Sequence, residues 1–178
     1  MSLKRDLDPR VALRIAKTFQ KKTQDLYARC ELAGSLRRKA PLVHDIDFAV
    51  IPRGEFEAWR EKVRERVVRI GGSVIAFGEV IADFKFMDAQ VNLFICPTRR
   101  SWGVTYMWAT GPKGHTIGMT IKAQKKGLLI NSQGIWTREK RPRLVTARTE
   151  REVGRILDWT YKDPEERGKQ ERRDTLYP

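Results

Sequence analysis

The sequence predicts an α/β fold, in which a mixed β-sheet with helices is followed by a small α/β subdomain. Two observations predict this class. Helical and extended apolar patterns alternate through the first hundred residues, which is typical of a sheet covered by helices. With 178 residues, of which 40% are apolar, the chain can bury a sizeable core but is too short for several independent modules. We expect the first unit over residues 1–105 and the second over 106–178.

The first helix is expected over residues 9–26. Asp8 and Pro9 have the pattern of an N-cap and a first helical position, and the apolar residues that follow recur at four-residue spacing. Two strands should come next. Residues 27–33 alternate in polarity until a Gly-Ser pair breaks the pattern, and residues 46–51 form a second extended run that Pro52 ends.

A second helix is predicted between residues 56 and 70, because its apolar residues fall on one helical face. Gly71-Gly72 can end this helix, since glycine readily adopts the left-handed conformation found after helix ends. Segments 73–79, 81–87 and 89–96 then alternate enough to be strands. Together these elements predict a mixed sheet.

The second unit is expected to begin after Pro97. Residues 114–126 predict a helix ended by Gly127. Residues 128–130 and 135–136 predict two short strands joined by turn residues.

The end of the chain should carry one more helix. Thr149 and Glu152 have the spacing of a capping box, in which two side chains satisfy opposite orphan amides, and this predicts a helix over 150–161. Residues 165–178 are highly charged and poor in apolar residues, so we expect a loosely held tail.

The formal net charge is +14, from 36 Lys and Arg against 22 Asp and Glu, and it is concentrated in the second half. Residues 95–148 contain eleven basic residues and one acid, Glu139. Basic surfaces displace counterions from phosphates and raise encounter rates, so the charge indicates a polyanionic partner. The alternative is a solvated basic face that only keeps the protein soluble.

Several classes are disfavoured by the sequence. No apolar run approaches the roughly 18 residues that cross a bilayer, and the N-terminus lacks the pattern of a signal peptide. No basic amphipathic helix suited to a membrane surface stands out. Two Cys and two His are too few for a disulfide scaffold or a zinc site. We therefore expect an intracellular protein, cytoplasmic or in a virus-infected cell, that is not secreted, binds no membrane and is a monomer.

Two acidic residues carry the strongest chemical signal. Asp45 and Asp47 lie two apart in an extended run, so both carboxylates face the same side. Such a pair can hold Mg²⁺, and two ions of this kind can stabilise the attacking and leaving oxygens of a phosphoryl transfer. Gly34 and Ser35 precede the pair, and a glycine turn lets backbone amides and a hydroxyl approach a phosphate. The alternative is an ordinary turn beside a strand end with two solvated acids.

The order Gly34-Ser35, Arg37-Arg38, Asp45-x-Asp47 resembles the nucleotidyltransferase signature of the family X DNA polymerases. Three further segments continue the resemblance, which spans residues 27–167: Thr110-Gly111 before a helix, Gly-Leu-Leu-Ile-Asn at 127–131, and Tyr-x-x-Pro-x-x-Arg at 161–167. The chain lacks the lyase domain and helix-hairpin-helix region of cellular members, so it is similar to minimal viral members. The resemblance implies a palm followed by a DNA- and nucleotide-binding subdomain.

The resemblance also implies roles for individual residues. Asp45 and Asp47 look like two of the three metal-binding catalytic carboxylates. The nucleotide would contact Gly34, Ser35, Arg38, His44, Trp108, Ala109, Thr110, Gly111 and Thr116. The DNA would contact Thr120, Lys122, Lys125, Lys126, Arg138, Lys140 and Arg141. Gly118 would let nucleic acid approach the backbone closely. Ala109 replaces a bulky aromatic residue near the sugar, so we expect weak exclusion of ribonucleotides.

The third carboxylate position departs from the family's pattern. The family has Asp between two hydrophobic residues followed by Phe, whereas this chain has Asn92 before Leu93-Phe94. In relatives that Asp ligates the metal and is placed to take the proton of the primer hydroxyl. An amide keeps a ligand oxygen but loses the charge and the basicity. Asn92 is thus a natural or engineered replacement in the catalytic and metal set, or a polar strand residue without such a role. Asp88 lies too far along its strand to compensate, and nothing in the sequence places Asp83 in the site.

Three functions follow from these patterns. The first is an X-type DNA polymerase that uses two Mg²⁺ or Mn²⁺ ions to add deoxynucleoside triphosphates to a primer, at short gaps or nicks during repair. The second is a DNA-binding protein that keeps the scaffold with impaired chemistry. The third is a nucleotidyltransferase that acts on RNA or another acceptor. The Thr-Gly helix and the Tyr-x-x-Pro-x-x-Arg segment favour the first function over the third.

Overall fold

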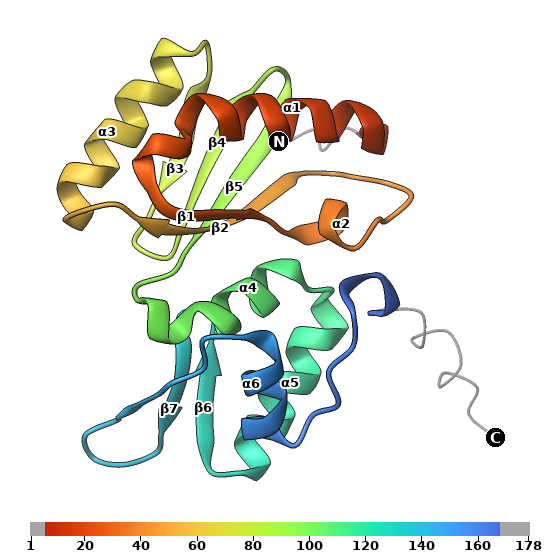
Figure 1. The fold of residues 1–178 in the computed structure, drawn as a ribbon, viewed down its shortest axis with the longest axis vertical. Coiled ribbons are helices and arrows are strands. Elements are labelled where there is room, and N and C mark those ends of the chain that lie inside the picture. Colours follow the sequence, from red (N-terminus) through yellow and green to blue (C-terminus); the bar gives the residue numbers. More distant parts are fainter. Residues whose placement is uncertain (1–5, 168–178) are drawn as a thin grey trace.

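A computed structural model describes residues 6–167, which fold into two stacked lobes (Figure 1). The sheet lobe, residues 6–98, contains α1 (Pro9–Thr23), β1 (Tyr27–Leu32), α2 (Gly34–Arg37), β2 (Ile46–Pro52), α3 (Phe56–Arg69), β3 (Ser73–Phe77), β4 (Ile81–Phe86) and β5 (Ala89–Ile95). The second lobe, residues 99–167, contains α4 (Trp102–Thr110), α5 (Lys113–Lys125), β6 (Leu128–Asn131), β7 (Gly134–Thr137), β8 (Leu144–Val145) and α6 (Glu150–Leu157). Short 3₁₀ turns occupy Gln24–Leu26, Arg99–Ser101 and Pro164–Glu166.

The sheet of the first lobe has the order β1-β2-β5-β4-β3. Strands β2 and β5 run parallel, and every other neighbouring pair is antiparallel. The predicted mixed sheet with helices is therefore confirmed. The parallel pair is central, which places its polar residues in the interior of the sheet rather than at an edge.

Helices α1 and α3 cover one face of this sheet, as Figure 1 shows. Alternate residues of β2, β4 and β5 point into the core that these helices close, and Phe19 of α1 packs on Phe48 and Phe84. Trp59 of α3 is 1% exposed in the same core. Burying aromatic side chains of this size contributes about 2–3 kcal/mol each, so this face fixes the register of the strands.

Most of the predicted starts and ends of the helices in this lobe are confirmed. The Asp8 carboxylate accepts hydrogen bonds from the N–H groups of Arg10 and Val11, as expected of an N-cap. Helix α1 ends at Thr23 rather than at residue 26, because residues 24–26 tighten into a 3₁₀ turn. Gly71 ends α3 with φ +87°.

The second lobe packs α4, α5 and α6 against a three-stranded sheet, β6-β7-β8. The two strands predicted at 128–130 and 135–136 are confirmed as the hairpin of β6 and β7, which begins and ends within one residue of these bounds. Two elements of this lobe were missed, α4 and the short strand β8, as was α2 in the sheet lobe. The apolar residues of α4 face both lobes, so its sequence lacks the one-sided stripe of a surface helix.

Helix α6 is shorter than the predicted 150–161. It ends at Leu157 because Asp158 adopts a left-handed conformation (φ +53°), after which the N–H of Trp159 donates to the carbonyl of Gly154 at 2.8 Å. At the start of α6, Thr149 caps the N–H of Glu152 as predicted. The Glu152 carboxylate accepts the N–H of Arg148 instead of that of Thr149, so the capping box is only half formed.

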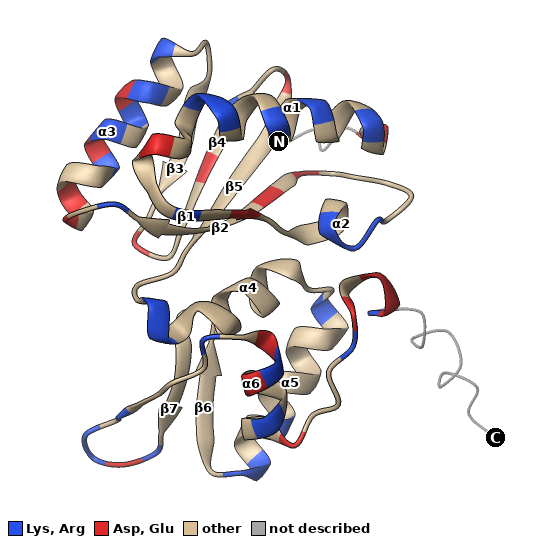
Figure 2. Cartoon of the chain, viewed as in Figure 1, with Lys and Arg blue, Asp and Glu red and all other residues tan. Residues whose placement is uncertain are grey.

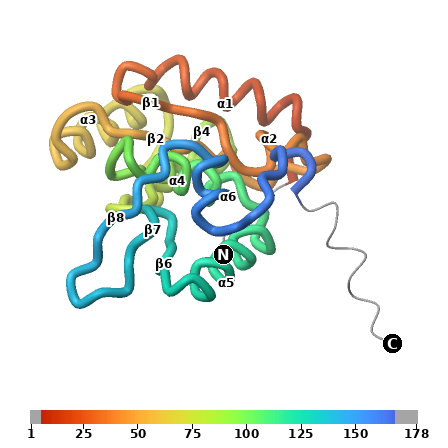
Figure 3. The backbone as a smooth tube through the Cα atoms, turned by 60° about the horizontal axis from the view of Figure 1, so that its bottom comes forward, coloured from red at the N-terminus to blue at the C-terminus, as the bar shows by residue number. Residues whose placement is uncertain are grey.

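The segment after α6 returns to the sheet lobe (Figures 1 and 3). Glu165 forms an ion pair with Lys39, just after α2, at 2.7 Å. The Arg167 side chain is 0% exposed. The expectation of a loosely held tail was therefore wrong for residues 165–167, because an exposed ion pair at Glu165 and a buried one between Arg167 and Glu150 hold them. Residues 168–178 lie outside the described part of the chain.

Helix α4 joins the lobes by packing against the second face of the sheet. A small buried cluster forms there from Ala33, Ala49, Ile51, Cys96, Trp102 and Ala109. Helix α4 contacts β2 and β5, and no helix of the described chain covers the same face of β3 and β4. This face therefore stays open beside β5.

Basic residues lie on both lobes (Figure 2). They line the outer face of α1 as well as the end of α5 and the loop between β7 and β8, so the charge is less confined to the second lobe than the sequence suggested. Among residues 6–167, no helix is both long and apolar enough to cross a membrane.

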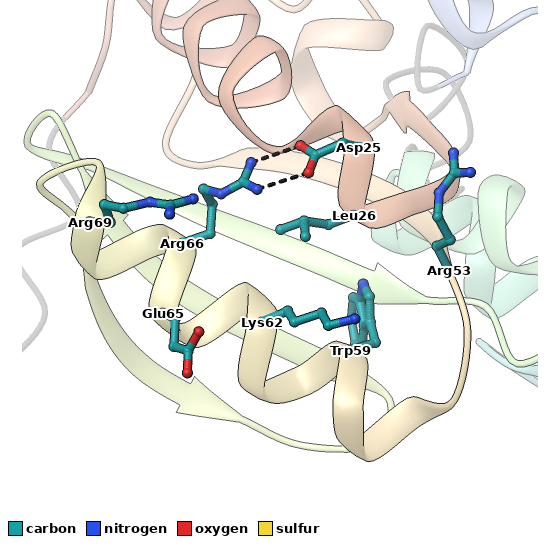
Figure 4. A pocket seen from close by; sticks show the side chains of 8 residues that line it. All are labelled: Asp25, Leu26, Arg53, Trp59, Lys62, Glu65, Arg66 and Arg69. Atoms are coloured by element: carbon teal, nitrogen blue, oxygen red, sulfur yellow. Dashed lines mark hydrogen bonds and ion pairs between the residues drawn. The ribbon is translucent and has the colours of Figure 1, made fainter.

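A pocket of about 480 Å³ opens at the end of β2 that is remote from Asp47 (Figure 4). Arg66 of α3 holds both carboxylate oxygens of Asp25 there, at 2.7 and 2.8 Å, and also donates to the carbonyl of Lys22. These bonds lower the pKa of the Asp25 carboxyl. Since Arg66 ties the end of α1 to α3, we interpret this pocket as part of the joint between two core helices.

His115 of α5 is buried in the second lobe. Its ring lies edge-on to Trp159, with 5.4 Å between ring centroids, and neither ring nitrogen has a hydrogen-bond partner among the described residues. Burial, together with the positive charge of Arg167, lowers the pKa of His115 to about 4. The imidazole is therefore neutral in the folded protein over most of the working pH range.

We predict that His115 makes the fold sensitive to mild acid. The unfolded chain takes up a proton near pH 6.5 and the folded chain does so only near pH 4, so stability present above pH 6.5 is lost as the pH falls toward 4. Between pH 7.5 and 5, the free energy of unfolding should fall by about 2 kcal/mol. Urea unfolding at both pH values measures it, and His115→Phe should remove most of the difference. An unchanged difference in His115→Phe would assign the acid sensitivity to other groups.

Candidate active site

The turn after β1 brings the backbone against Asp47. The N–H of Ala33 donates to the carbonyl of Asp47 at 2.8 Å, and Gly34 follows with φ +58°. A Cβ added at Gly34 would lie 2.0 Å from Oδ2 of Asp47. Glycine is required here for two reasons, the left-handed conformation and the space that the carboxylate occupies.

Asp47 and Asn92 form the centre of the site. They are direct partners in the parallel register of β2 and β5. Nδ2 of Asn92 donates to Oδ1 of Asp47 at 2.9 Å, and Oδ1 of Asn92 accepts from Nε2 of Gln90 at 2.9 Å. Asn92 is only 6% exposed. An ionised aspartate at position 92 would repel Asp47, whereas the amide satisfies it.

Two further acids lie close in the fold. Asp45 is half-buried in the bend just before β2. Asp83 on β4 is the direct partner of Asn92 in the antiparallel register of β4 and β5. The sequence analysis did not place Asp83 in the site, because only the strand pairing gives its position. The run of alternating residues in 81–87 was the one available signal.

A buried ion network joins the two lobes beside this site. Arg37 of α2 donates to both carboxylate oxygens of Glu150, at 2.8 and 2.6 Å, and Arg167 donates to the same carboxylate at 3.0 Å. Arg37 also stacks on the ring of Tyr106, with 3.7 Å to the ring centroid. Glu150 is 8% exposed. The network connects α2, α4, α6 and the last described turn.

The Thr110-Gly111 segment is held by both arginines of α2. Nη1 of Arg37 donates to Oγ1 of Thr110 at 2.6 Å, and Nη1 of Arg38 donates to the carbonyl of Thr110. The peptide bond after Gly111 is cis. Burial lowers the pKa of Arg38, while the charge of Asp47 opposes this shift. Arg38 therefore lies between the two lobes, within electrostatic reach of Asp47.

The other residues expected to contact the nucleotide lie in different parts of the structure. Oγ of Ser35 is buried and has no hydrogen-bond partner among residues 6–167, so it can donate to a ligand. His44 is turned toward Asp6, with 2.7 Å between Nδ1 and the carboxylate, and is not brought to Asp47. Trp108 packs against the core of the second lobe. Ala109 is 5% exposed in the cluster between the lobes.

Helix α5 carries the residues expected near the base pair. The hydroxyls of Thr116 and Thr120 donate to carbonyls of the preceding turn, and both residues are half-buried. The role expected for Gly118 was wrong. A Cβ at Gly118 would lie 2.2 Å from the Trp159 ring, so this glycine makes room for a side chain of the same protein and not for nucleic acid.

The basic residues expected at DNA fall into two groups. Lys122 and Lys126 both contact Asp158, through its carbonyl and its carboxylate, which ties α5 to the end of α6. The remaining predicted residues are exposed: Lys125 at the end of α5, and Arg138, Lys140 and Arg141 in the loop between β7 and β8. This loop is the most projecting basic part of the second lobe (Figure 2).

Comparison with known proteins identifies this arrangement. Residues 105–168 match the family model of the DNA polymerase beta thumb. The ternary primer–template complex of Leishmania infantum polymerase beta superposes with a TM-score of 0.75, at 19% identity over 93% of this chain and 77% of that one. The fold is that of polymerase beta. The ternary gap complex of the same enzyme gives a TM-score of 0.75 at 18% identity, over 92% of this chain and 71% of that one. No curated protein matches the sequence.

The polymerase beta fold raises the question of whether these residues suit divalent cations. Asp45 and Asp47 offer carboxylate oxygens, and Asn92 would offer its amide oxygen in place of the hydrogen bond that this oxygen accepts from Gln90. Oxygens of both kinds are hard ligands that Mg²⁺ and Mn²⁺ prefer. Within residues 6–167, no three His, Cys, Asp or Glu side chains are gathered closely enough to hold an ion by themselves. The donor set therefore fits a cation that keeps water or phosphate oxygens among its ligands.

We predict that Gly34→Ala displaces Asp47 and destabilises the fold by about 2–4 kcal/mol, from the left-handed backbone and the overlap with the carboxylate. Gly127→Ala is the matched control, because Gly127 has φ +68° and nothing within 4 Å of its added Cβ. Urea unfolding of both variants separates the two terms. Equal losses would show that the contact with Asp47 costs nothing.

We also predict that Glu150→Gln lowers stability by about 3–5 kcal/mol, because it leaves two buried guanidinium groups without a compensating charge. Thermal and urea unfolding measure the change. Glu139→Gln is the control, since Glu139 pairs with Arg143 on the exposed β7–β8 loop and should change stability little. A loss at Glu150 no larger than that at Glu139 would contradict the structural role of the network.

Proposed function

We propose that the protein is a nucleotidyltransferase that adds deoxynucleotides to the 3′-hydroxyl of a DNA primer, at short gaps or nicks. The observation that carries this proposal is the contact of the Gly34 turn with Asp47, next to Asn92, in a chain with the polymerase beta fold. The primer–template and gap complexes of the matched polymerase support a DNA substrate of this kind.

Asp45, Asp47 and the amide oxygen of Asn92 would hold two Mg²⁺ or Mn²⁺ ions. When bound, these ions would neutralise phosphate charge and polarise the reacting oxygens. The rest of the task is positioning, which phosphoryl transfer mainly requires. Gly34 and Ser35 offer backbone amides and a hydroxyl to the triphosphate, and Arg38 adds positive charge beside Asp47.

The second lobe would supply the grip on DNA. Thr110 and Gly111 are fixed by Arg37 and Arg38, so the start of α5 has a set position relative to Asp47. The exposed basic side chains of α5 and of the β7–β8 loop can pair with backbone phosphates. The acceptor, DNA rather than RNA, is part of the proposal.

Asn92 favours a second candidate, a DNA-binding protein with impaired chemistry. Both ends of its amide are already hydrogen-bonded within the site, to Asp47 and Gln90. Loss of a positioned base typically lowers a rate by about 10²–10⁴-fold. On this reading the protein holds gapped DNA without extending it efficiently.

Primer extension on gapped DNA, with all four deoxynucleoside triphosphates and Mg²⁺ or Mn²⁺, separates the two candidates. We predict slow extension by the unsubstituted protein, extension about 10²-fold faster by Asn92→Asp, and none by Asp47→Asn. Extension that survives both Asp45→Ala and Asp47→Ala would refute the site. Salt-dependent DNA binding without any extension, even by Asn92→Asp, would establish the binding protein instead.

A further inference from the structure

Three polar residues form a row across the open face of the sheet. Asp47 on β2 is paired with Asn92 on β5, and Asn92 is paired with Asp83 on β4. Directly paired residues on neighbouring strands project to the same side of a sheet. Asp83 therefore faces the same side as Asp47, while Phe48, Leu93 and their neighbours face the core under α1 and α3.

A position on an edge strand, which is a common place for an acid in a sheet, does not explain Asp83. Aspartate is disfavoured in strands, and charged residues that block aggregation belong on edge strands. Strand β4 is an interior strand, between β5 and β3. Asp83 is also half-buried, whereas the side chain of Asp88 in the following turn is 85% exposed.

We propose that Asp83 supplies the cation site with the negative charge that position 92 lacks. The proposal rests on the cation site of the proposed function. Residues paired across neighbouring strands have Cβ atoms about 5 Å apart, so Asp83 lies roughly 10 Å from Asp47, with Asn92 between them. At this separation Asp83 does not share an ion with Asp47 directly, which agrees with the absence of a three-acid cluster among the described residues.

The negative charge of Asp83 would act on the cation in two ways, through the water molecules bound to the cation and through the electrostatic field. Mg²⁺ keeps several waters when few protein groups ligate it, and a carboxylate at the outer edge of that shell accepts their hydrogen bonds. A full negative charge about 10 Å from the cation, across a partly buried surface, still raises the affinity of the site for a divalent cation. Added salt weakens this effect. Asn92 would bridge the two acids, with its amide donating to Asp47.

Binding of Mn²⁺ to the full chain, followed by the electron paramagnetic resonance signal of the free ion, tests this inference without any turnover. Asp83→Asn should weaken binding about 5- to 10-fold at low salt and less at 0.5 M salt. Asp88→Asn is the matched control, because it removes the same charge from the next turn and should leave the affinity unchanged. Asn92→Asp combined with Asp83→Asn moves the negative charge to β5 and should bind Mn²⁺ at least as tightly as the unsubstituted protein.

Two outcomes separate a failure of this inference from a failure of the cation site. If Asp47→Asn abolishes Mn²⁺ binding while Asp83→Asn binds like Asp88→Asn, the role of Asp83 is refuted and the site stands. If neither Asp47→Asn nor Asp83→Asn changes the affinity, the cation site itself is refuted. Circular dichroism of each variant establishes that it is folded, and Asp83→Ser provides a second neutral variant if Asp83→Asn is not.

Discussion

The carboxylate of Glu150 is the interaction on which the arrangement of the two lobes depends. It lies between the guanidinium groups of Arg37 and Arg167, all three largely buried, so no partner can be removed without leaving a charge in a poorly solvated place. One acid from the second lobe thereby fixes α2 of the sheet lobe and the last turn of the described chain. A buried pair of this kind contributes little net stability over an apolar contact, but it accepts only one geometry.

That geometry extends to the candidate site through adjacent residues of α2. Arg37 holds Glu150 and Thr110, Arg38 holds the Thr110 carbonyl, and Gly34 in the first turn of the same helix touches Asp47. Three residues, Gly34, Arg37 and Arg38, thus link the junction of the lobes, the start of α5 and the acidic centre. The Gly-Ser-x-Arg-Arg pattern serves both tasks: its glycine lies against Asp47, and its first arginine holds Glu150 and Thr110.

Local patterns in the sequence predicted much of the fold, and the pair Asp45 and Asp47, because each depends on neighbours within a few residues. The Asp8 cap, the glycine stop after α3 and the extended run of β2 are of this kind. What could not be predicted depends on contacts distant in sequence. Helix α6 ends early at the left-handed Asp158, which engages Lys122 and Lys126, and Trp159 then lies against Gly118. Asp83 comes opposite Asn92 only through the register of β4 and β5.

The protein has a formal net charge of +14, yet the centre of its candidate site is acidic. The basic side chains are mostly exposed, so they raise the affinity for a polyanion but are screened and exchange easily. The acids near Asn92 are half-buried in one row of the sheet, where a phosphate can approach only with a cation between them. Position 92 carries an asparagine where the family has an aspartate. The asparagine donates a hydrogen bond to Asp47, whereas an aspartate would repel it. The row is thereby more stable without a cation than a row with aspartate at position 92, and on our proposal its affinity for a cation depends more on Asp83.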